Sequence, residues 1–501
     1  MRELIGYAAV ALPWVLAVGI PLVAMLALLL GRRTSGWWVA AYYLLLFCIP
    51  NNSYGLLDPL QDRNFYSRGT GTFYFSAINV LLFGLAIQAF FARRFAQPLP
   101  VRHNLALPAL LLGLIMAGNV VVFTQLPHVR WFQLIGTSGL LHFVNFMLAF
   151  YVLVNALRAP ADLRRFVNLL LVCGVLRGLW GVVRFAALGG DPANFYNNFQ
   201  HIDVRFTFFD INDSLVATMV LFVALWRLAT GEVQRFWPRV GMWAIVALEL
   251  FVVVFSYRRT AWGGLALAAL MLALSLRGRW RWGLFASYLG VGLPLLVYKM
   301  LLRGDYKTSS GSFLERMLPD VVQGGQFSFT TGRFAELYAA WLTLKHDWVL
   351  GLGAWGQYDG FRFSELAWHR GDFSWMHSGV LHVWLKFGVV GVAIVLAAAW
   401  LYVRFVWQQQ RQVAPHFRGL LLLGAAGAVF FLPTLLIGTP LIEFRTMQLL
   451  AFCVALPYVA AQVAHAGGQI APAAPVKQRR WVFGIRPLPL RRSALLPNQH
   501  S

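Results

Sequence analysis

Charged residues are scarce in this sequence, and acidic residues are the scarcest of them. Only 12% of the 501 residues are charged, whereas a soluble protein carries roughly 25%. Hydrophobic residues make up 59% of the chain, and the mean hydropathy is +0.63. This composition excludes an ordinary soluble domain and predicts an integral membrane protein.

The shortage of acidic residues leaves a formal net charge of +23, from 42 Lys and Arg against 19 Asp and Glu. In a soluble protein this excess would suggest nucleic-acid binding. In a membrane protein, basic residues mark the loops that stay in the cytoplasm. Membrane lipids are therefore expected partners, and nucleic acid is not.

Cysteine is equally scarce. Cys48, Cys173 and Cys453 each lie in an apolar run, and they form neither a disulfide framework nor a metal-ligand spacing. A His-Glu-x-x-His motif is also missing. No internal repeat is visible, which argues against a transporter built from inverted repeats. We expect small core cysteines, no metal site and no cofactor.

Apolar runs that can cross a bilayer recur along the chain. A membrane-spanning helix needs about 20 mostly apolar residues. The first run is too long for the apolar region of a signal peptide and lacks a small-residue cleavage site, so we interpret it as an anchor. We predict an all-α, polytopic membrane helix bundle of about 12 or 13 spans, from runs at 4–30, 37–50, 73–91, 105–122, 140–157, 167–188, 214–230, 240–256, 260–276, 284–302, 380–403, 420–437 and 447–464.

Arginine content alternates between successive short loops, and this alternation indicates which side of the membrane each loop faces. By the positive-inside rule, the arginine-rich loops face the cytoplasm and the others face outward. The side of the N-terminus stays open, because it depends on whether the first two runs both cross. The predicted parts are a first transmembrane part (1–302), a large periplasmic loop (303–379), the last spans (380–464) and a basic, disordered cytoplasmic tail (465–501).

The loop 303–379 is the only long hydrophilic insertion, and it carries its own helix signal. Apolar residues recur at helical spacing before a Gly-x-Gly at Gly351 and Gly353. We expect an amphipathic helix on the outer surface that caps the bundle; a surface helix without a catalytic role is the alternative. The apolar residues are Phe334, Leu337, Trp341 and Leu344.

Six arginines are expected on the outer side of the membrane, which makes them exceptions to the positive-inside rule. A charged residue in or beside a span costs roughly 3 kcal/mol and is usually functional. Clustered arginines suit a phosphate or diphosphate, which they bind through bidentate hydrogen bonds. The alternative is snorkelling or pairing with a carboxylate, for which few acidic partners lie nearby. The six are Arg177, Arg184, Arg205, Arg258, Arg259 and Arg333.

His377 lies in SWMHSGVLHVWLKFGVVG, where the long loop re-enters the membrane. A neutral imidazole there could take a proton from an acceptor hydroxyl. We interpret His142 and His382 as hydrogen-bonded residues at helix starts. Glu249 is the one clear acidic residue well inside a run. Ion- and proton-coupled carriers normally need such groups, so their scarcity argues against coupled transport, and we interpret Glu249 as a paired structural residue rather than a proton relay.

Four motifs, taken in order, resemble those of the bacterial O-antigen ligase and O-antigen polymerase superfamily. The resemblance covers about residues 165–450. The motifs are FFDIND, which contains Asp210 and Asn212, then SYRRTAWGG, RFAELYAAWLTLKHDWVLGLGAWG and HSGVLHVWLKFGVVG.

The resemblance assigns roles to particular residues. It implies that His377 is the essential histidine, that Arg258 or Arg259 is the arginine of a Ser-x-Arg motif, and that Arg333 is the arginine that opens the loop helix. Many relatives have a second His and an Asn after the motif histidine, where this chain has Ser and Gly.

The family implies transfer of a glycan from undecaprenyl diphosphate to an acceptor hydroxyl on the periplasmic face of the bacterial inner membrane. The leading hypothesis is an O-antigen ligase-type glycosyltransferase with lipid A–core as acceptor, His377 as general base and arginines stabilising the diphosphate without a metal. An O-antigen polymerase, a protein O-oligosaccharyltransferase, and a carrier or flippase for a lipid-linked anionic solute are the alternatives. Further substrate contacts are expected from Arg177, Arg184, Arg205, Asp210 and Asn212.

Overall fold

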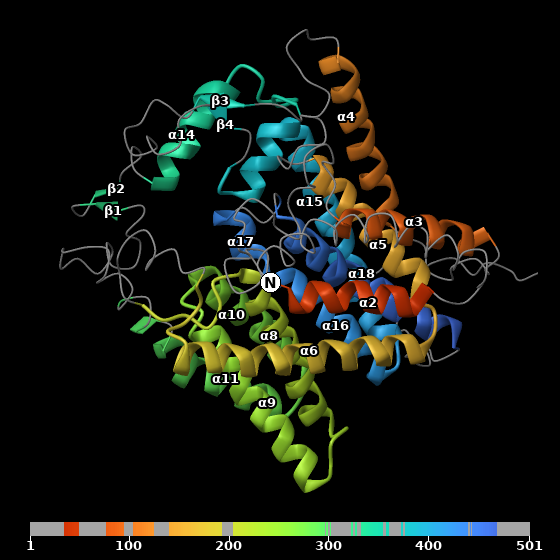
Figure 1. Ribbon diagram of the computed structural model, residues 1–501, viewed down its shortest axis with the longest axis vertical. Coiled ribbons are helices and arrows are strands. Elements are labelled where there is room, and N and C mark those ends of the chain that lie inside the picture. Colours follow the sequence, from red (N-terminus) through yellow and green to blue (C-terminus); the bar gives the residue numbers. More distant parts are fainter. Residues whose placement is uncertain are drawn as a thin grey trace, which may run out of the picture.

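A computed structural model of the chain describes a bundle of helices (Figure 1). The predicted run at 4–30 and most of the predicted tail lie outside the described residues. The described residues are 35–49, 77–94, 104–124, 140–192, 204–295, 297–298, 301, 322–323, 326–327, 332–353, 357–359, 372–373, 376–438, 441 and 443–467.

Helices dominate the described part, as the hydropathy predicts, and nearly every apolar run falls on one of them. The helices before the long loop are α2 (Ser35–Cys48), α3 (Ala77–Arg94), α4 (Ala106–Thr124), α5 (Leu140–Ala156), α6 (Pro160–Ala187), α8 (Ile211–Thr230), α9 (Phe236–Val254), α10 (Arg259–Ser275) and α11 (Arg279–Ser287), which continues into a π-helical turn, η2 (Tyr288–Gly292). Those in and after the loop are α14 (Gly332–Leu344), α15 (Gly379–Gln412), α16 (Pro415–Phe430), α17 (Leu432–Ile437) and α18 (Phe444–Ala466).

The all-α polytopic bundle is confirmed. Six helical stretches of the described part are long and apolar enough to cross a membrane: α6, α8, α9, α15, α16 with α17, and α18. Shorter apolar helices lie in α2, α3, α4, α5 and α10. The strands of the described part are two antiparallel pairs of two-residue strands, β1 (Val322–Gln323) with β2 (Gln326–Phe327) and β3 (Tyr358–Asp359) with β4 (Asp372–Phe373).

The core is built around α18, which packs against α5 and α16 and is mostly buried. Glycines bring the α16 backbone close to it. A Cβ on Gly427 would lie 2.4 Å from Cys453 Sγ, and one on Gly424 would lie 2.6 Å from the Cys453 carbonyl oxygen. Small residues at helix contacts are typical of membrane bundles, where van der Waals packing replaces the hydrophobic effect. The prediction that Cys453 is a small core residue is confirmed.

The predicted loop helix is α14, and it lies with β3 and β4 beside the start of α15, at the upper left of the molecule (Figure 1). Helices α8 to α11 lie together below it in the same view, with α17 between the two groups. The candidate site residues come from both groups.

Candidate active site

His377 lies at the junction between the long loop and α15. It directly precedes Ser378, the N-cap of α15, whose side chain accepts a hydrogen bond from the Leu381 amide at 3.4 Å. Such a cap gives a hydrogen-bond partner to one of the backbone amides that have none within the first turn of a helix. The His377 side chain keeps 34% of its surface exposed, so its ring can be reached by a substrate.

Glu336 of α14 holds both the backbone and the ring of His377. Its Oε1 accepts the His377 amide at 2.9 Å, and its Oε2 lies 2.9 Å from His377 Nδ1. Because a carboxylate only accepts hydrogen bonds, Nδ1 carries a hydrogen, and in the neutral ring the lone pair is then on Nε2. The sequence reasoning missed Glu336, since a glutamate on an amphipathic helix reads as part of its solvated face. It is in fact buried.

Tyr358 of β3 completes this cluster. Its hydroxyl donates to Glu336 Oε1 at 3.0 Å. Burial, followed by the charge of Glu336, raises the pKa of Tyr358 above its ordinary range, so the hydroxyl stays protonated and remains a donor. Oε1 therefore receives two hydrogen bonds and Oε2 receives one.

Apolar packing fixes α14 against the start of α15. The indole rings of Trp341 and Trp384 lie 5.5 Å apart, centre to centre, and Trp384 Nε1 donates to the Trp348 carbonyl at 2.9 Å. A small buried cluster also joins the two helices and β3, and it is formed by Ala339, Ala340, Tyr358, Met376 and Leu385.

The Gly-x-Gly turn after α14 docks into a break in α15. Gly388 has a φ of 63°, which interrupts the helix. Backbone hydrogen bonds cross the break: the Val389 amide donates to the Trp348 carbonyl at 3.0 Å, and the Leu352 amide donates to the Leu385 carbonyl at 2.8 Å. The glycines of two separate sequence motifs therefore form one contact, which ties the loop to the helix that follows His377.

A second candidate region, separate from the one around His377, contains Arg258, which is the N-cap of α10. The preceding Tyr257 has a φ of 53°, a left-handed conformation that costs a non-glycine residue of order 1 kcal/mol. The Arg258 guanidinium lies 4.5 Å from the centre of the Phe209 ring, within the range of a cation–π contact. Burial lowers the pKa of Arg258, and the negative charges of Glu443 and Asp210 oppose that effect.

Glu443, the N-cap of α18, is the acidic neighbour that most favours the charge on Arg258. Burial, then the charge of Asp210, raises the pKa of Glu443 from 4.5 to about 7, although Arg258 and Arg445 act in the opposite direction. The Thr446 hydroxyl donates to its Oε2 at 2.6 Å. Glu443 is thus a carboxyl group next to a candidate anion-binding arginine and is only partly ionised at neutral pH.

Arg445 is fully buried and forms the centre of an ion network that the sequence reasoning missed. It donates to Asp210 Oδ2 at 2.7 Å and to Asp213 Oδ1 at 2.8 Å. It also donates to the carbonyls of Leu46 and Phe47 in α2, so it ties α2, α8 and α18 together. A buried charge that keeps such partners is a structural element of the bundle.

Asp210 and Asn212 take part in the same network. Asn212 Nδ2 donates to Asp210 Oδ1 at 2.8 Å and to Thr446 Oγ1 at 2.9 Å, which links Asp210 to Glu443 through Thr446. Asp210 also caps α8 by accepting the Asn212 amide at 2.9 Å. Asp210 and Asn212 are therefore connected to Glu443, the neighbour of Arg258, through hydrogen bonds that pass by way of Thr446.

Arg177 and Arg184 each form an ion pair with a carboxylate. Arg177 donates to both oxygens of Asp213, at 2.8 and 3.2 Å, and Arg184 donates to Asp191 at 2.6 Å. The expectation that few acidic partners lie nearby is wrong for these two arginines. The partners lie up to 36 positions away, and folding brings them together. Both guanidinium groups also lie over the ring of Phe208.

For the remaining three candidate arginines, the structure gives the position in the chain and, for two of them, the degree of exposure. Arg259 is the first residue of α10 and is half-buried. Arg205 is exposed just before the buried Phe206. Arg333 belongs to the first turn of α14, one turn before Glu336, and its side chain lies outside the described residues.

Helix α17 connects the two candidate regions. A Cβ on Gly263 of α10 would lie 3.2 Å from Pro433 of α17, and one on Gly379 of α15 would lie 3.1 Å from Leu435. The helix that follows Arg258 and the helix that follows His377 therefore pack on the same short helix. His377, the candidate base, and Arg258, the candidate anion-binding residue, therefore each precede a helix that packs on α17.

Two further predictions about polar residues are wrong. Glu249 is buried, and within the described residues neither of its oxygens has a hydrogen-bond partner. It lies against Gly178 of α6, whose neighbour Arg177 is paired with Asp213 instead. His142 was expected to be hydrogen-bonded, but in the described part of the chain its ring nitrogens have no such partner and its ring packs edge-on against Phe444.

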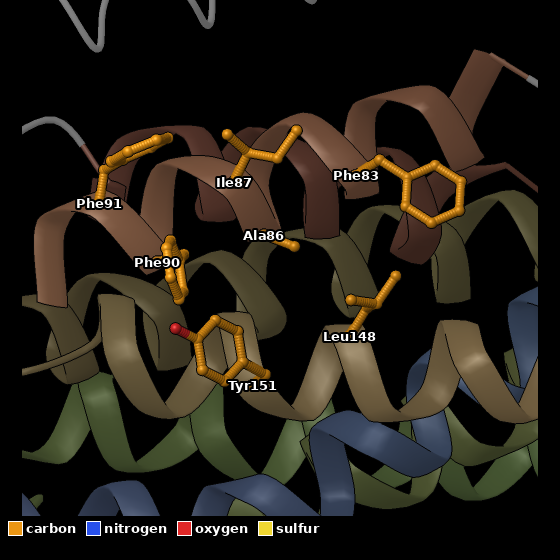
Figure 2. Close-up of a pocket in the computed structure, with 7 residues that line it drawn as sticks. All are labelled: Phe83, Ala86, Ile87, Phe90, Phe91, Leu148 and Tyr151. Carbon is orange, nitrogen blue, oxygen red and sulfur yellow. The ribbon is translucent and has the colours of Figure 1, made fainter. Parts of the chain in front are cut away.

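An apolar pocket lies apart from these groups, between α3 and α5. Figure 2 shows its lining, which is almost entirely hydrocarbon. Such a lining can accommodate a hydrocarbon chain but offers no charged group to a diphosphate or a sugar. The lining residues are Phe83, Ala86, Ile87, Phe90, Phe91, Leu148 and Tyr151.

The helices and the loop-borne histidine define a polytopic membrane protein whose polar candidate site forms where the long loop meets the bundle. A sequence model of the family described as O-antigen ligase matches residues 240–396, from α9 into α15. This confirms the resemblance to the O-antigen ligase superfamily, whose members are glycosyltransferase-like enzymes, and leaves ligase and polymerase undistinguished. The chain matches no protein of curated function. The matched segment contains Arg258, Arg259, Arg333, Glu336 and His377.

Proposed function

We propose that this protein is a membrane glycosyltransferase of the O-antigen ligase type. It transfers a glycan from undecaprenyl diphosphate to a sugar hydroxyl of lipid A–core, on the periplasmic face of the bacterial inner membrane. The observation that carries the proposal is the pair formed by the partly exposed His377 and the buried Glu336, inside the segment that matches the family.

The chemistry is one direct displacement. His377 Nε2 takes the proton of the acceptor hydroxyl as its oxygen attacks the anomeric carbon of the donor glycan. The bond from that carbon to the diphosphate oxygen breaks, and undecaprenyl diphosphate leaves with the bonding electron pair. Attack from the side opposite the leaving group inverts the anomeric configuration.

Arginines would stabilise the charge that develops on the leaving diphosphate. Arg258 is supported best, because it lies in the matched segment and because the helix that it caps, α10, packs on α17, as does the helix that follows His377. Arg259 and Arg333 are the other two candidates. Arg177 and Arg184 already bind carboxylates, so we assign them, together with Asp210 and Asn212, to the support of this region rather than to direct catalysis.

Purified protein tests this proposal. It is incubated with an undecaprenyl-diphosphate-linked glycan and, separately, with lipid A–core, a second lipid-linked glycan or an acceptor protein. A covalent glycan–lipid A–core product supports the ligase, whereas chain extension or a glycoprotein would identify a polymerase or a protein O-oligosaccharyltransferase. Movement of the lipid-linked glycan across a vesicle membrane without any covalent product would identify a carrier or flippase and reject the proposal.

A further inference from the structure

We propose that Glu336 is a positioning residue that fixes the tautomer and the orientation of the His377 ring. This inference rests on the proposed function, because it concerns the same base. Neither the sequence motifs nor the family match assigns a role to Glu336. It adds an acidic group to a site that the sequence described only by its histidine and its arginines.

The geometry shows a carboxylate that holds one residue at two points. Oε1 accepts from the His377 amide and Oε2 contacts Nδ1, each at 2.9 Å. One contact fixes the backbone of His377, and the other fixes the rotation of its ring. Only 5% of the Glu336 side chain is exposed, so water competes little for either contact.

The chemistry requires this arrangement. A general base needs its lone pair on the nitrogen that faces the acceptor, and an unconstrained neutral imidazole divides its hydrogen between two tautomers. Glu336 selects the form with hydrogen on Nδ1 and keeps Nε2 as the acceptor of the proton. When the ring becomes an imidazolium during the reaction, the adjacent carboxylate also stabilises its charge.

A purely structural role is the competing interpretation, since the same contacts tie the loop to α15. Replacement by glutamine separates the two roles. Two donors, the His377 amide and the Tyr358 hydroxyl, converge on Oε1, so the amide oxygen of Gln will take that position. Its NH2 group then faces Nδ1 and donates to it, which moves the ring hydrogen to Nε2. Glu336→Gln therefore keeps the loop contact but leaves the base in the wrong tautomer.

The experiment measures kcat, KM and thermal stability for Glu336→Gln, His377→Ala and the double variant, with lipid-linked donor and saturating acceptor. Glu232→Gln is the matched control, because Glu232 is an exposed partner of Arg227 at 3.9 Å, between α8 and α9. We expect Glu336→Gln to lower kcat by about 10²- to 10⁴-fold with little change in KM or Tm. The double variant should be no slower than His377→Ala, because both changes remove the same function.

Each outcome has one meaning. Near-normal kcat in Glu336→Gln, with His377→Ala inactive, would overturn the inference and leave the proposed function intact. An active His377→Ala would instead reject the base itself. If Glu336→Gln does not fold, Glu336→Asp replaces it: the charge is kept, but the shorter side chain cannot reach both contacts, so kcat should fall at least about 10-fold. Normal kcat in Glu336→Asp would count against the inference.

Discussion

Gly351 and Gly388 lie so close together that a Cβ on Gly351 would be 2.5 Å from the Gly388 amide nitrogen. Conversely, a Cβ on Gly388 would lie 2.0 Å from the Val349 carbonyl oxygen. Both glycines have positive φ values, 75° and 63°. The loop turn and the break in α15 therefore fit together only without side chains, and this contact joins the helix that carries Glu336 to the helix that follows His377.

The first prediction concerns this contact. Gly388→Ala should release the loop turn, because the new methyl group clashes and because the backbone of residue 388, with φ 63° and ψ −168°, is in a region essentially restricted to glycine, which costs any other residue about 1–3 kcal/mol. We expect a lower Tm, faster proteolysis of the loop and a large loss of glycan transfer. Gly241→Ala is the control, since Gly241 lies within α9 with open space around it, and Ala favours a helix. A Gly388→Ala variant as stable as wild type would contradict the contact.

The second prediction concerns Arg258. If Arg258 binds the leaving diphosphate with its planar fork, then Arg258→Lys keeps the charge but should lower transfer by at least about 10-fold. Arg259→Lys and Arg333→Lys show whether those arginines share this role. The control is Arg165→Lys, an arginine of α6 whose side chain is 58% exposed. EDTA should have little effect on any of them. Near-normal transfer in all three site variants, or complete loss with EDTA alone, would defeat the metal-free arginine clamp.

The third prediction concerns the ion network of Arg445. Arg445→Met leaves Asp210 and Asp213 buried beside an uncharged side chain, which should lower the free energy of unfolding by about 3–5 kcal/mol. Asp213 keeps Arg177, so most of the cost arises at Asp210. Arg165→Met removes an exposed ion pair at 3.7 Å and a contact of the guanidinium with the Trp37 ring at 5.2 Å, and it should cost only about 1 kcal/mol. Equal Tm values for the two variants would show that the network contributes little.

The fourth prediction concerns pH and Glu443. Its pKa rises from 4.5 to about 7 in the folded protein, so between these values the folded state holds more protons than the unfolded chain. Stability from this group is therefore largest below pH 4.5 and decreases as the pH rises toward 7.

Glu443→Gln removes that titration. The Tm difference between Glu443→Gln and wild type should grow in favour of the variant as the pH increases from 4.5 to above 7. Glu232→Gln, at an exposed position, should follow wild type throughout. A constant difference between Glu443→Gln and wild type over this range would show that Glu443 does not titrate there.

Much of this architecture could be predicted from the sequence, because its signals are local. Hydropathy gives the helices, and apolar spacing with a closing Gly-x-Gly gives α14. The position of His377 follows from where the loop ends. These features depend on neighbouring residues, so a single sequence contains them.

The features that the sequence did not predict depend on contacts between residues that are far apart in the chain. Glu336 and His377 are 41 positions apart, and Asp213 and Arg445 are 232 positions apart. A single sequence carries no record of such pairs. Counting the acidic residues nearby in sequence therefore made Arg177 and Arg184 look unpaired. Glu336 was not singled out, because a glutamate on an amphipathic helix is typical of its solvated face. Glu249 was misjudged for the same reason, since being inside an apolar run does not supply a partner.

The most direct measurement is glycan transfer by purified His377→Ala, compared with wild type at equal protein and equal Tm. Donor and acceptor are present in excess, and the covalent product is quantified over time. We expect transfer to fall by at least about 10²-fold without loss of folding, because the acceptor hydroxyl then lacks its base. Transfer at the wild-type rate by the folded variant would contradict this expectation.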